Sequence, residues 1–269
     1  MGYSVLMSVY QKEKPEYLAQ ALDSVIDQTL APDEILLMED GPLTEALYQL
    51  IDEYKNKCPQ LVIFQFEENV QLGRALAKGV ELCSNELIAR MDTDDIAVRD
   101  RFEQQYAYMI AHEDVAVCGG WMEEFNDEGT YSKIKMMPES SEDLRRYARY
   151  RNPLNHMTVM FRKTAVLAAG NYTHFPLLED YRLWSCMLAS DARFYNLPTV
   201  LVRMRNNDGV YDRRGGVAYF KQYRKLRKEQ RKLGLLTPQE YVLALGLTAG
   251  MTLQPAFLRK IMYRRVLRK

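Results

Sequence analysis

The sequence lacks the cysteine spacing of a disulfide framework or of a zinc site. Its four cysteines, Cys58, Cys83, Cys118 and Cys186, stand far apart in 269 residues, and no two of them form a CxxC pair. Small disulfide-rich domains and zinc-binding modules group their cysteines closely. We therefore expect reduced thiols, as in a cytosolic enzyme.

Signals for export and for membrane insertion are also missing. The first 15 residues, MGYSVLMSVYQKEKP, turn polar after one apolar run of strand length, so they do not resemble a signal peptide. The longest apolar run, YVLALGLTAGMTL at 241–253, is shorter than the roughly 20 residues that cross a bilayer. These absences predict a cytoplasmic protein without a spanning helix.

No glycine-rich turn follows the first apolar run. Residues 8–16, SVYQKEKPE, contain no glycine, whereas a dinucleotide-binding dehydrogenase needs glycines there for the cofactor's pyrophosphate. A sugar nucleotidyltransferase would need an early loop rich in glycine and arginine, and this loop is missing as well. The sequence therefore disfavours both enzyme classes.

The net charge is zero only because two regions of opposite sign cancel. Residues 1–212 hold 21 Lys and Arg against 34 Asp and Glu, whereas residues 213–269 hold 15 against 2. Such asymmetry indicates a basic segment that meets an anionic partner. No nucleic-acid-binding motif accompanies the segment, so we expect an anionic membrane surface and not nucleic acid. The alternative is that the segment packs on the acidic remainder of the chain.

Apolar runs of strand length alternate with helical patterns in the first part of the chain. We expect strands at 3–9, 34–39, 61–66 and 86–91, and helices from Pro15, over about 43–57 and over 72–83. Continuous Val, Ile and Leu strands between helices predict a parallel sheet that is covered on both faces. From 114 onward the pattern is mixed, with shorter strands expected at 115–121, 156–161, 192–197 and 199–204. From 212 onward the chain reads as helical and basic.

Acidic residues gather where the fourth predicted strand ends. Asp92, Asp94 and Asp95 occupy three of four positions there, and like charges so close need a cation or a solvated turn. Asp92 and Asp94 point the same way in an extended segment, and Thr93 points the other way. Mg²⁺ and Mn²⁺ prefer carboxylate oxygens together with substrate phosphates. The spacing predicts a metal site at Asp92 and Asp94, whereas Asp95 fits an acidic cap of the next helix.

Five ordered motifs resemble family 2 glycosyltransferases of GT-A fold, and most closely the bacterial enzymes that build capsular and O-antigen polysaccharides. The motifs are SVY (8–10), EDG (39–41), ENVQLGRALAKG (68–79), ELIARMDTDD (86–95) and LEDYRLW (178–184). The resemblance covers about residues 3–205.

This resemblance implies an α/β fold, Rossmann-like, with a mostly parallel central sheet and flanking helices. The catalytic domain would span 1–212, with a nucleotide-binding half over about 1–113 and an acceptor-binding half over about 114–212. Residues 213–269 would form a basic helical extension.

For the donor side, the resemblance implies a nucleotide-sugar site with a UDP-sugar as the expected donor. Asp40 would accept an N–H of the base, Asp92 would contact the ribose, and Asp94 would ligate the Mn²⁺ or Mg²⁺ that bridges the diphosphate. The expected nucleotide-sugar-binding residues are Ser8, Val9, Tyr10, Asp40, Arg74, Asp92, Thr93 and Asp94. Taken alone, Asp40 could equally be a turn residue and Tyr10 a packing residue.

For the acceptor side, the resemblance implies that Asp180 is the catalytic base of an inverting transfer to a lipid-linked glycan at the inner face of the cell membrane. The acids at this position could also simply favour a helix N-terminus. His156, Glu179 and Trp184 are further acceptor-side candidates, although His156 could be structural and Trp184 has the helical spacing of a core residue. A non-catalytic sugar-nucleotide-binding or scaffold protein is the alternative function.

Overall fold

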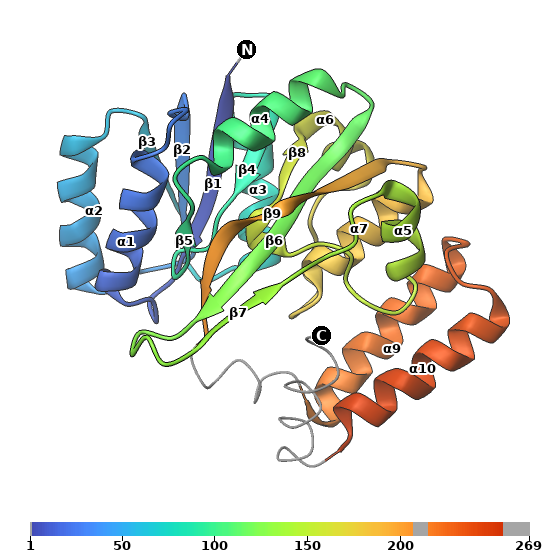
Figure 1. Cartoon of the computed structure of the whole chain (residues 1–269). Helices are drawn as coiled ribbons and strands as arrows, with labels where there is room; N and C mark the ends of the chain where they lie inside the picture. Colours follow the sequence, from blue (N-terminus) through green and yellow to red (C-terminus); the bar gives the residue numbers. More distant parts are fainter. Residues whose placement is uncertain (1, 207–214, 255–269) are drawn as a thin grey trace.

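Within the described residues, 2–206 and 215–254, a mixed sheet runs through the molecule and helices cover both of its faces (Figure 1). The structure is a computed structural model. The strands lie in the order β3-β2-β1-β4-β8-β6-β9-β5, and β7 pairs with β6. Their bounds are β1 Tyr3–Val9, β2 Glu34–Glu39, β3 Leu61–Gln65, β4 Leu87–Arg90, β5 Ile96–Ala97, β6 Val115–Phe125, β7 Ser132–Lys135, β8 Met160–Arg162 and β9 Arg193–Arg205.

Helices divide between the two faces of the sheet according to the core clusters that they join. Buried side chains of α1, α2 and α4 pack in one cluster, and those of α3, α5, α6 and α7 pack in the other. The bounds are α1 Pro15–Ile26, α2 Glu45–Lys57, α3 Leu72–Leu82, α4 Arg101–Ala111, α5 Ser141–Tyr147, α6 Lys163–Ala168, α7 Glu179–Ala189, α9 Gly216–Lys232 and α10 Pro238–Thr252.

The first half of the sheet is parallel, as the apolar runs predict. β1 pairs in parallel with β2 and β4, and β2 pairs in parallel with β3. Val5 and Met7 of β1 join the cluster under α1, and Leu6 between them joins the cluster under α3. Because both faces are buried, the strand is apolar at every one of these positions.

The second half is mixed. β8 runs antiparallel to β4 and to β6, whereas β6 and β9 run parallel to each other. The carboxyl ends of β1, β2 and β4 therefore point to one edge of the sheet, and the second half borders that edge.

The prediction of a strand over 156–161 is wrong for the first half of that range. Residues His156–Thr158 form a 3₁₀ turn, and β8 begins only at Met160. The Thr158 side chain donates to the Asn155 carbonyl at 2.8 Å, and the Thr158 N–H donates to the same oxygen at 2.9 Å. A hydroxyl that bonds back to its own turn competes with strand pairing.

The two strands expected at 192–197 and 199–204 are one continuous strand, β9. Pro198 lies inside it and has no N–H to donate to a neighbour. The pairing with β6 shifts register at this point, from Leu197 opposite Gly120 to Val200 opposite Trp121. An irregularity in the ladder therefore accommodates the proline without ending the strand.

The helical pair α9–α10 packs on the body of the molecule. Arg227 of α9 is buried and donates to the carbonyls of Arg149 and Tyr150, at 2.9 and 2.6 Å, and to the hydroxyl of Tyr181 at 2.8 Å. The acids of the pair also face the body, because Glu229 forms an ion pair with Arg182 and Glu240 forms one with Arg149. The expected boundary at 212 falls at residues outside the described ones.

None of the helices in the described ranges is both long and apolar enough to cross a membrane. α10, which contains most of the longest apolar run, spans 15 residues.

Candidate functional site

Three aspartates meet beyond the end of β4. Asp92, Asp94 and Asp95 each offer a carboxylate oxygen, and these oxygens lie within 4.8 Å of one another. The predicted pair is therefore brought together, and Asp95 joins it. Strand β4 places the cluster at the edge of the sheet where a ligand of a parallel sheet is expected.

Two buried arginines lie beside the cluster. Arg90 forms an ion pair with Asp92. Arg205 donates from Nε to the Asp94 carbonyl at 3.1 Å and from its main-chain N–H to Asp95 Oδ1 at 2.9 Å. Of the three carboxylates, Asp92 is thus held by a cationic side chain and Asp95 by a main-chain N–H.

Asp95 does not cap the next helix, contrary to the expectation from sequence. Strand β5 follows it at once, and α4 begins at Arg101 after Asp100. The side chain is buried, and Asp95 Oδ2 has no hydrogen-bond partner among the described residues. Burial and the charges of Asp94 and Asp92 raise the pKa of Asp95 well above its usual value.

The cluster holds more negative charge than its surroundings balance. Burial, followed by the charges of Asp92 and Glu13, raises the pKa of Asp94 to about 7. Hard divalent cations bind where oxygen donors converge and where the negative charge of these donors is not neutralised by neighbouring groups. The residues present therefore fit a divalent cation, which Asp94 and Asp92 would hold.

Several residues expected to bind the donor lie at the carboxyl end of β1, the strand that pairs with β4. Val9 is buried, Ser8 is half-buried, and Tyr10 leaves 39% of its side chain exposed. Thr93 donates its hydroxyl to Glu13 at 2.6 Å, so its side chain points to the segment after β1. An exposed ring at the end of a strand is available to stack on a flat ligand.

Asp40 orders the loop that leads into α3. Its Oδ1 accepts the N–H groups of Val70 and Gln71, at 2.7 and 3.2 Å, and its Oδ2 accepts the side-chain amide of Asn69 at 3.1 Å. Arg74 is exposed in the first turn of α3, directly after this loop. Asp40 thus has a structural task, and Oδ2 keeps one lone pair for a further donor.

Asp180 stands in the first turn of α7 with both oxygens hydrogen-bonded. Asn152 donates its amide to Oδ2 at 2.5 Å, and the Tyr181 N–H donates to Oδ1 at 2.7 Å. Hydrogen bonds from amides and the positive end of a helix both favour an ionised carboxylate. Asp180 is half-buried, so it remains accessible from one side.

The neighbouring acid, Glu179, has the opposite environment. Its carboxyl is buried, and Oε2 has no hydrogen-bond partner among the described residues. Burial first, and then the charge of Asp180, raises the pKa of Glu179 to about 7. Of the two acids, Asp180 is therefore the one with a hydrogen-bond donor on each carboxylate oxygen.

His156 and Trp184 differ in what they can reach. His156 Nε2 lies 2.9 Å from the Tyr172 hydroxyl, and burial together with the charge of Arg90 lowers the pKa of His156 well below its usual value. The Trp184 ring is fully buried beside Tyr172 and Phe194. Trp184 thus offers no face to a sugar. Its position is that of a core residue, as its helical spacing indicated.

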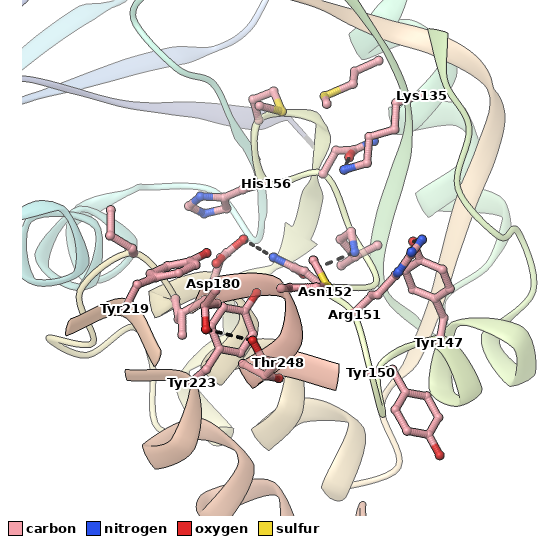
Figure 2. A pocket seen from close by; sticks show the side chains of 18 of the residues that line it. Lys135, Tyr147, Tyr150, Arg151, Asn152, His156, Asp180, Tyr219, Tyr223 and Thr248 are labelled. Atoms are coloured by element: carbon pink, nitrogen blue, oxygen red, sulfur yellow. Dashed lines mark hydrogen bonds between the residues drawn. The ribbon is translucent and has the colours of Figure 1, made fainter. Parts of the chain in front are cut away.

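A cleft of about 250 Å³ opens beside Asp180. Figure 2 shows Asp180 close to Asn152 and His156, with Tyr219 and Tyr223 on the wall that α9 provides. The remaining lining includes residues from the second half of the sheet and from α10, among them Met122, Lys135, Arg151, Met204, Leu247, Thr248 and Met251. The cleft is therefore built jointly by the body and by the helical pair.

The aspartate cluster and the cleft adjoin each other at Tyr172. Burial is the main cause that raises the pKa of this hydroxyl; the charge of Arg90 lowers it, and the charges of Asp180, Glu179 and Asp92 raise it further. Acidic groups from both places are thus close enough to influence the same side chain. A donor at the cluster and an acceptor in the cleft would meet there.

Asn152 and Glu13 belong to the site although sequence reasoning did not select them. Asn152 lies 28 residues before its partner Asp180, and Glu13 lies 80 residues before its partner Thr93. A single Asn or Glu in a loop has no spacing that marks it. Sequence reasoning also did not select Tyr219 and Tyr223 of α9, because the basic residues beside and after them dominate the pattern of this segment.

Comparisons with known proteins agree with this geometry. The family model for glycosyl transferase family 2 matches residues 4–169. The amylovoran biosynthesis glycosyltransferase of Erwinia amylovora is 43% identical over 219 residues, which are 81% of this chain and 82% of that protein. The UDP-Gal:alpha-D-GlcNAc-diphosphoundecaprenol beta-1,3-galactosyltransferase of Escherichia coli is 33% identical over 99% of this chain and 97% of its own length.

A solved structure shares the fold at low identity. S. aureus TarS in complex with UDP-GlcNAc superposes with a TM-score of 0.70 at 17% identity, over 99% of this chain and 76% of that one. The sheet with its flanking helices is accordingly a GT-A fold, followed by C-terminal helices. With the matched family and two relatives above 30% identity, the chain belongs to glycosyl transferase family 2.

Proposed function

We propose that this glycosyltransferase moves a sugar from a UDP-sugar to a hydroxyl of a lipid-linked glycan, in the synthesis of a cell-surface polysaccharide. The observation that carries the proposal is the adjacency of two sites across Tyr172. On one side stands the aspartate cluster, and on the other stands Asp180 at the cleft wall. A transferase for two substrates needs both a place for the leaving diphosphate and a base for the acceptor.

On the donor side, Tyr10, Asp40 and Arg74 would surround the base, and Asp92 would contact the ribose. Ser8, Val9 and Thr93 would shape the strand ends under the nucleotide. Mn²⁺ or Mg²⁺, held by Asp94 with Asp92, would stabilise the negative charge that develops on the leaving diphosphate. The surplus negative charge around Asp94 supports this assignment.

On the acceptor side, Asp180 would accept the proton of the acceptor hydroxyl. The hydroxyl oxygen forms a bond to the anomeric carbon while the bond from that carbon to the diphosphate oxygen breaks, and the electron pair leaves with UDP. One displacement inverts the anomeric centre. A positioned base contributes about 10²–10⁴ in rate, and the hydrogen bond from Asn152 would supply the positioning.

The lining of the cleft and the name of one relative support a lipid-linked glycan as the acceptor. The Escherichia coli relative is named for a diphosphoundecaprenol-linked acceptor. In this chain, the cleft combines the cationic side chains Lys135 and Arg151 with apolar side chains such as Leu247 and Met251. Such a lining suits an amphiphilic acceptor that carries phosphate, and His156 and Glu179 would border it.

We place the enzyme at the inner face of the cell membrane as a peripheral protein. Residues 1–212 would form the catalytic domain, and residues 213–269, with 15 Lys and Arg against 2 acids, would meet the anionic surface. A lipid-linked acceptor stays in the membrane, so its enzyme has to work there.

A panel of nucleotide sugars tests the proposal. Each is incubated with the protein and Mn²⁺ or Mg²⁺, and release of the nucleotide is measured with and without a short-chain diphospholipid acceptor. We expect one or more UDP-sugars to be hydrolysed slowly, faster with acceptor, and not at all with EDTA. Binding of a nucleotide sugar without any turnover would favour the non-catalytic binding or scaffold protein instead.

A further inference from the structure

The outward side of α10 is apolar and uncovered. Val242, Leu243 and Leu247 leave 67%, 53% and 52% of their surface exposed. The opposite side of the helix is buried through Ala244, Thr248 and a further threonine one turn later. No charged residue occurs between 241 and 253, so nothing polar interrupts the exposed side. A surface helix normally turns charged or polar residues to water.

The neighbouring helix α9 adds positive charge to the same helical pair. Its buried residues Tyr219, Leu226, Arg227 and Gln230 recur at helical spacing and define its inner side. The exposed basic residues fall on the other side, and they are Lys221, Arg224, Lys225, Lys228, Arg231 and Lys232.

The acids of this helical pair do not neutralise these cations. Glu229 and Glu240 are already paired with Arg182 and Arg149 of the body. The exposed cations on α9 therefore have no acid of their own helices to pair with. A helical pair that exposes cations on one helix and apolar side chains on the other is complementary to an anionic lipid surface.

We propose that α9 and α10 dock on an anionic bilayer, with the apolar side of α10 among the headgroups and the exposed cations of α9 on lipid phosphates. We define the docking surface as Val242, Leu243 and Leu247 together with these cations. Docking is shallow, because α10 is too short to span a bilayer and its other side is buried.

The docking surface reaches the acceptor cleft. Leu247 is half exposed on the outward side of α10 and also lines the cleft, beside Thr248 and Met251. Asp180 lines the same cleft. A lipid-linked molecule could keep its chain in the bilayer and pass its polar end along Leu247 to Asp180. This last step rests on the proposed transfer reaction, whereas docking assigns residues to the membrane contact proposed for 213–269.

Vesicle flotation tests the docking surface with the full-length protein. The vesicles are phosphatidylcholine with phosphatidylglycerol, or phosphatidylcholine alone. We expect binding to the anionic vesicles only, and release at high salt. The double variant Val242→Ser with Leu243→Ser should bind about tenfold more weakly, as should Arg224→Gln with Lys228→Gln.

A matched control removes apolar surface elsewhere. Val62 in β3 and Ile134 in β7 are 46% and 51% exposed, so Val62→Ser with Ile134→Ser removes a similar exposed area from other parts of the molecule. This variant should bind like the wild type. Circular dichroism and the melting temperature establish that every variant is folded.

Three results would overturn the proposal. One is equal binding of the wild type to neutral and anionic vesicles, or no binding to either. Another is unchanged binding by both helix variants, which would place the contact at residues 255–269. The third is a dimer seen by light scattering that the α10 variant abolishes, which would assign the apolar side to a second copy.

Donor hydrolysis on the same samples separates this inference from the proposed function. The helix variants should hydrolyse a UDP-sugar at the wild-type rate in the absence of lipid. If the wild type shows no hydrolysis but the vesicle results are as expected, the proposed function fails and the docking surface stands.

Discussion

The side-chain amide of Asn152 donates to Asp180 Oδ2 at 2.5 Å, across 28 residues of sequence. Together with the N–H of Tyr181 on Oδ1, this contact fixes both oxygens of the carboxylate at the cleft. Glu179, one position earlier, has no such partner for its Oε2 within the described part of the chain. Two adjacent acids therefore lie in different environments, one hydrogen-bonded at both oxygens and the other buried with an oxygen unpaired.

Glu179 should make stability depend on pH in a defined window. Its folded pKa of about 7 lies above the ordinary value of 4.5, so the folded state holds a proton that the unfolded state has lost. The contribution of Glu179 to the stability of the wild type then falls as pH rises from about 4.5 to about 7. The Glu179→Gln variant should gain stability relative to the wild type over this window, by at most about 3 kcal/mol.

Urea unfolding at several pH values measures this difference. Glu142 in α5 is exposed, and Glu142→Gln should show no such trend. A constant difference between Glu179→Gln and the wild type from pH 4 to pH 8 would contradict a protonated Glu179.

Asp94→Asn should abolish metal-dependent turnover while the fold survives. The substitution removes one ligand charge with little change in shape, and the expected loss is about two orders of magnitude or more. The free Mn²⁺ signal in electron paramagnetic resonance provides a second readout, since the variant should leave more Mn²⁺ unbound. Asp52→Asn on α2, at an exposed acid, serves as the control. Full wild-type activity in EDTA would defeat the metal assignment.

The product should carry the anomeric configuration opposite to that of the donor. A single displacement at the anomeric carbon has this outcome, with Asp180 as base and no covalent intermediate on the enzyme. The coupling constant of the new anomeric proton, measured by NMR on the purified product, reports the configuration. A product that retains the donor configuration would require a second nucleophile and would be incompatible with a single displacement.

Arg227→Gln should loosen the helical pair from the body. The guanidinium donates to two carbonyls and a hydroxyl in a buried place, so its loss leaves acceptors without partners at a cost of about 3 kcal/mol. Transfer to the acceptor should also fall, because α9 provides Tyr219 and Tyr223 to the cleft. Lys57→Gln, at an exposed position of α2, should change neither. Equal urea midpoints for the two variants would show that Arg227 does not anchor α9.

Local sequence patterns were sufficient for the first half of the fold. A strand that is buried on both faces must be apolar throughout, so β1 and β2 were visible at their observed bounds. The end of such a strand is also a fixed place for a ligand, and this is why Asp92 and Asp94 could be predicted as a pair. Both inferences depend only on neighbours in sequence.

Contacts between distant segments could not be predicted in this way. The run KQYRKLRKEQRK shows seven basic residues, and nothing in it distinguishes the buried Arg227 from the exposed Lys228. The partners of Arg227 are carbonyls almost 80 residues earlier, which carry no sequence signal. The expectation of a separate basic tail therefore missed that α9 and α10 complete the cleft.

The central claim is that Asp180 is the base of a UDP-sugar transfer, and a paired measurement on Asp180→Asn tests it most directly. Asp191, just beyond α7, has a side chain that is 90% exposed, and Asp191→Asn removes the same charge as a control. Donor affinity is measured by calorimetry and transfer to a diphospholipid acceptor by mass spectrometry. We predict nearly unchanged affinity and transfer lowered by about two orders of magnitude or more in Asp180→Asn alone. Transfer by Asp180→Asn at the wild-type rate would contradict the role of Asp180 as the base.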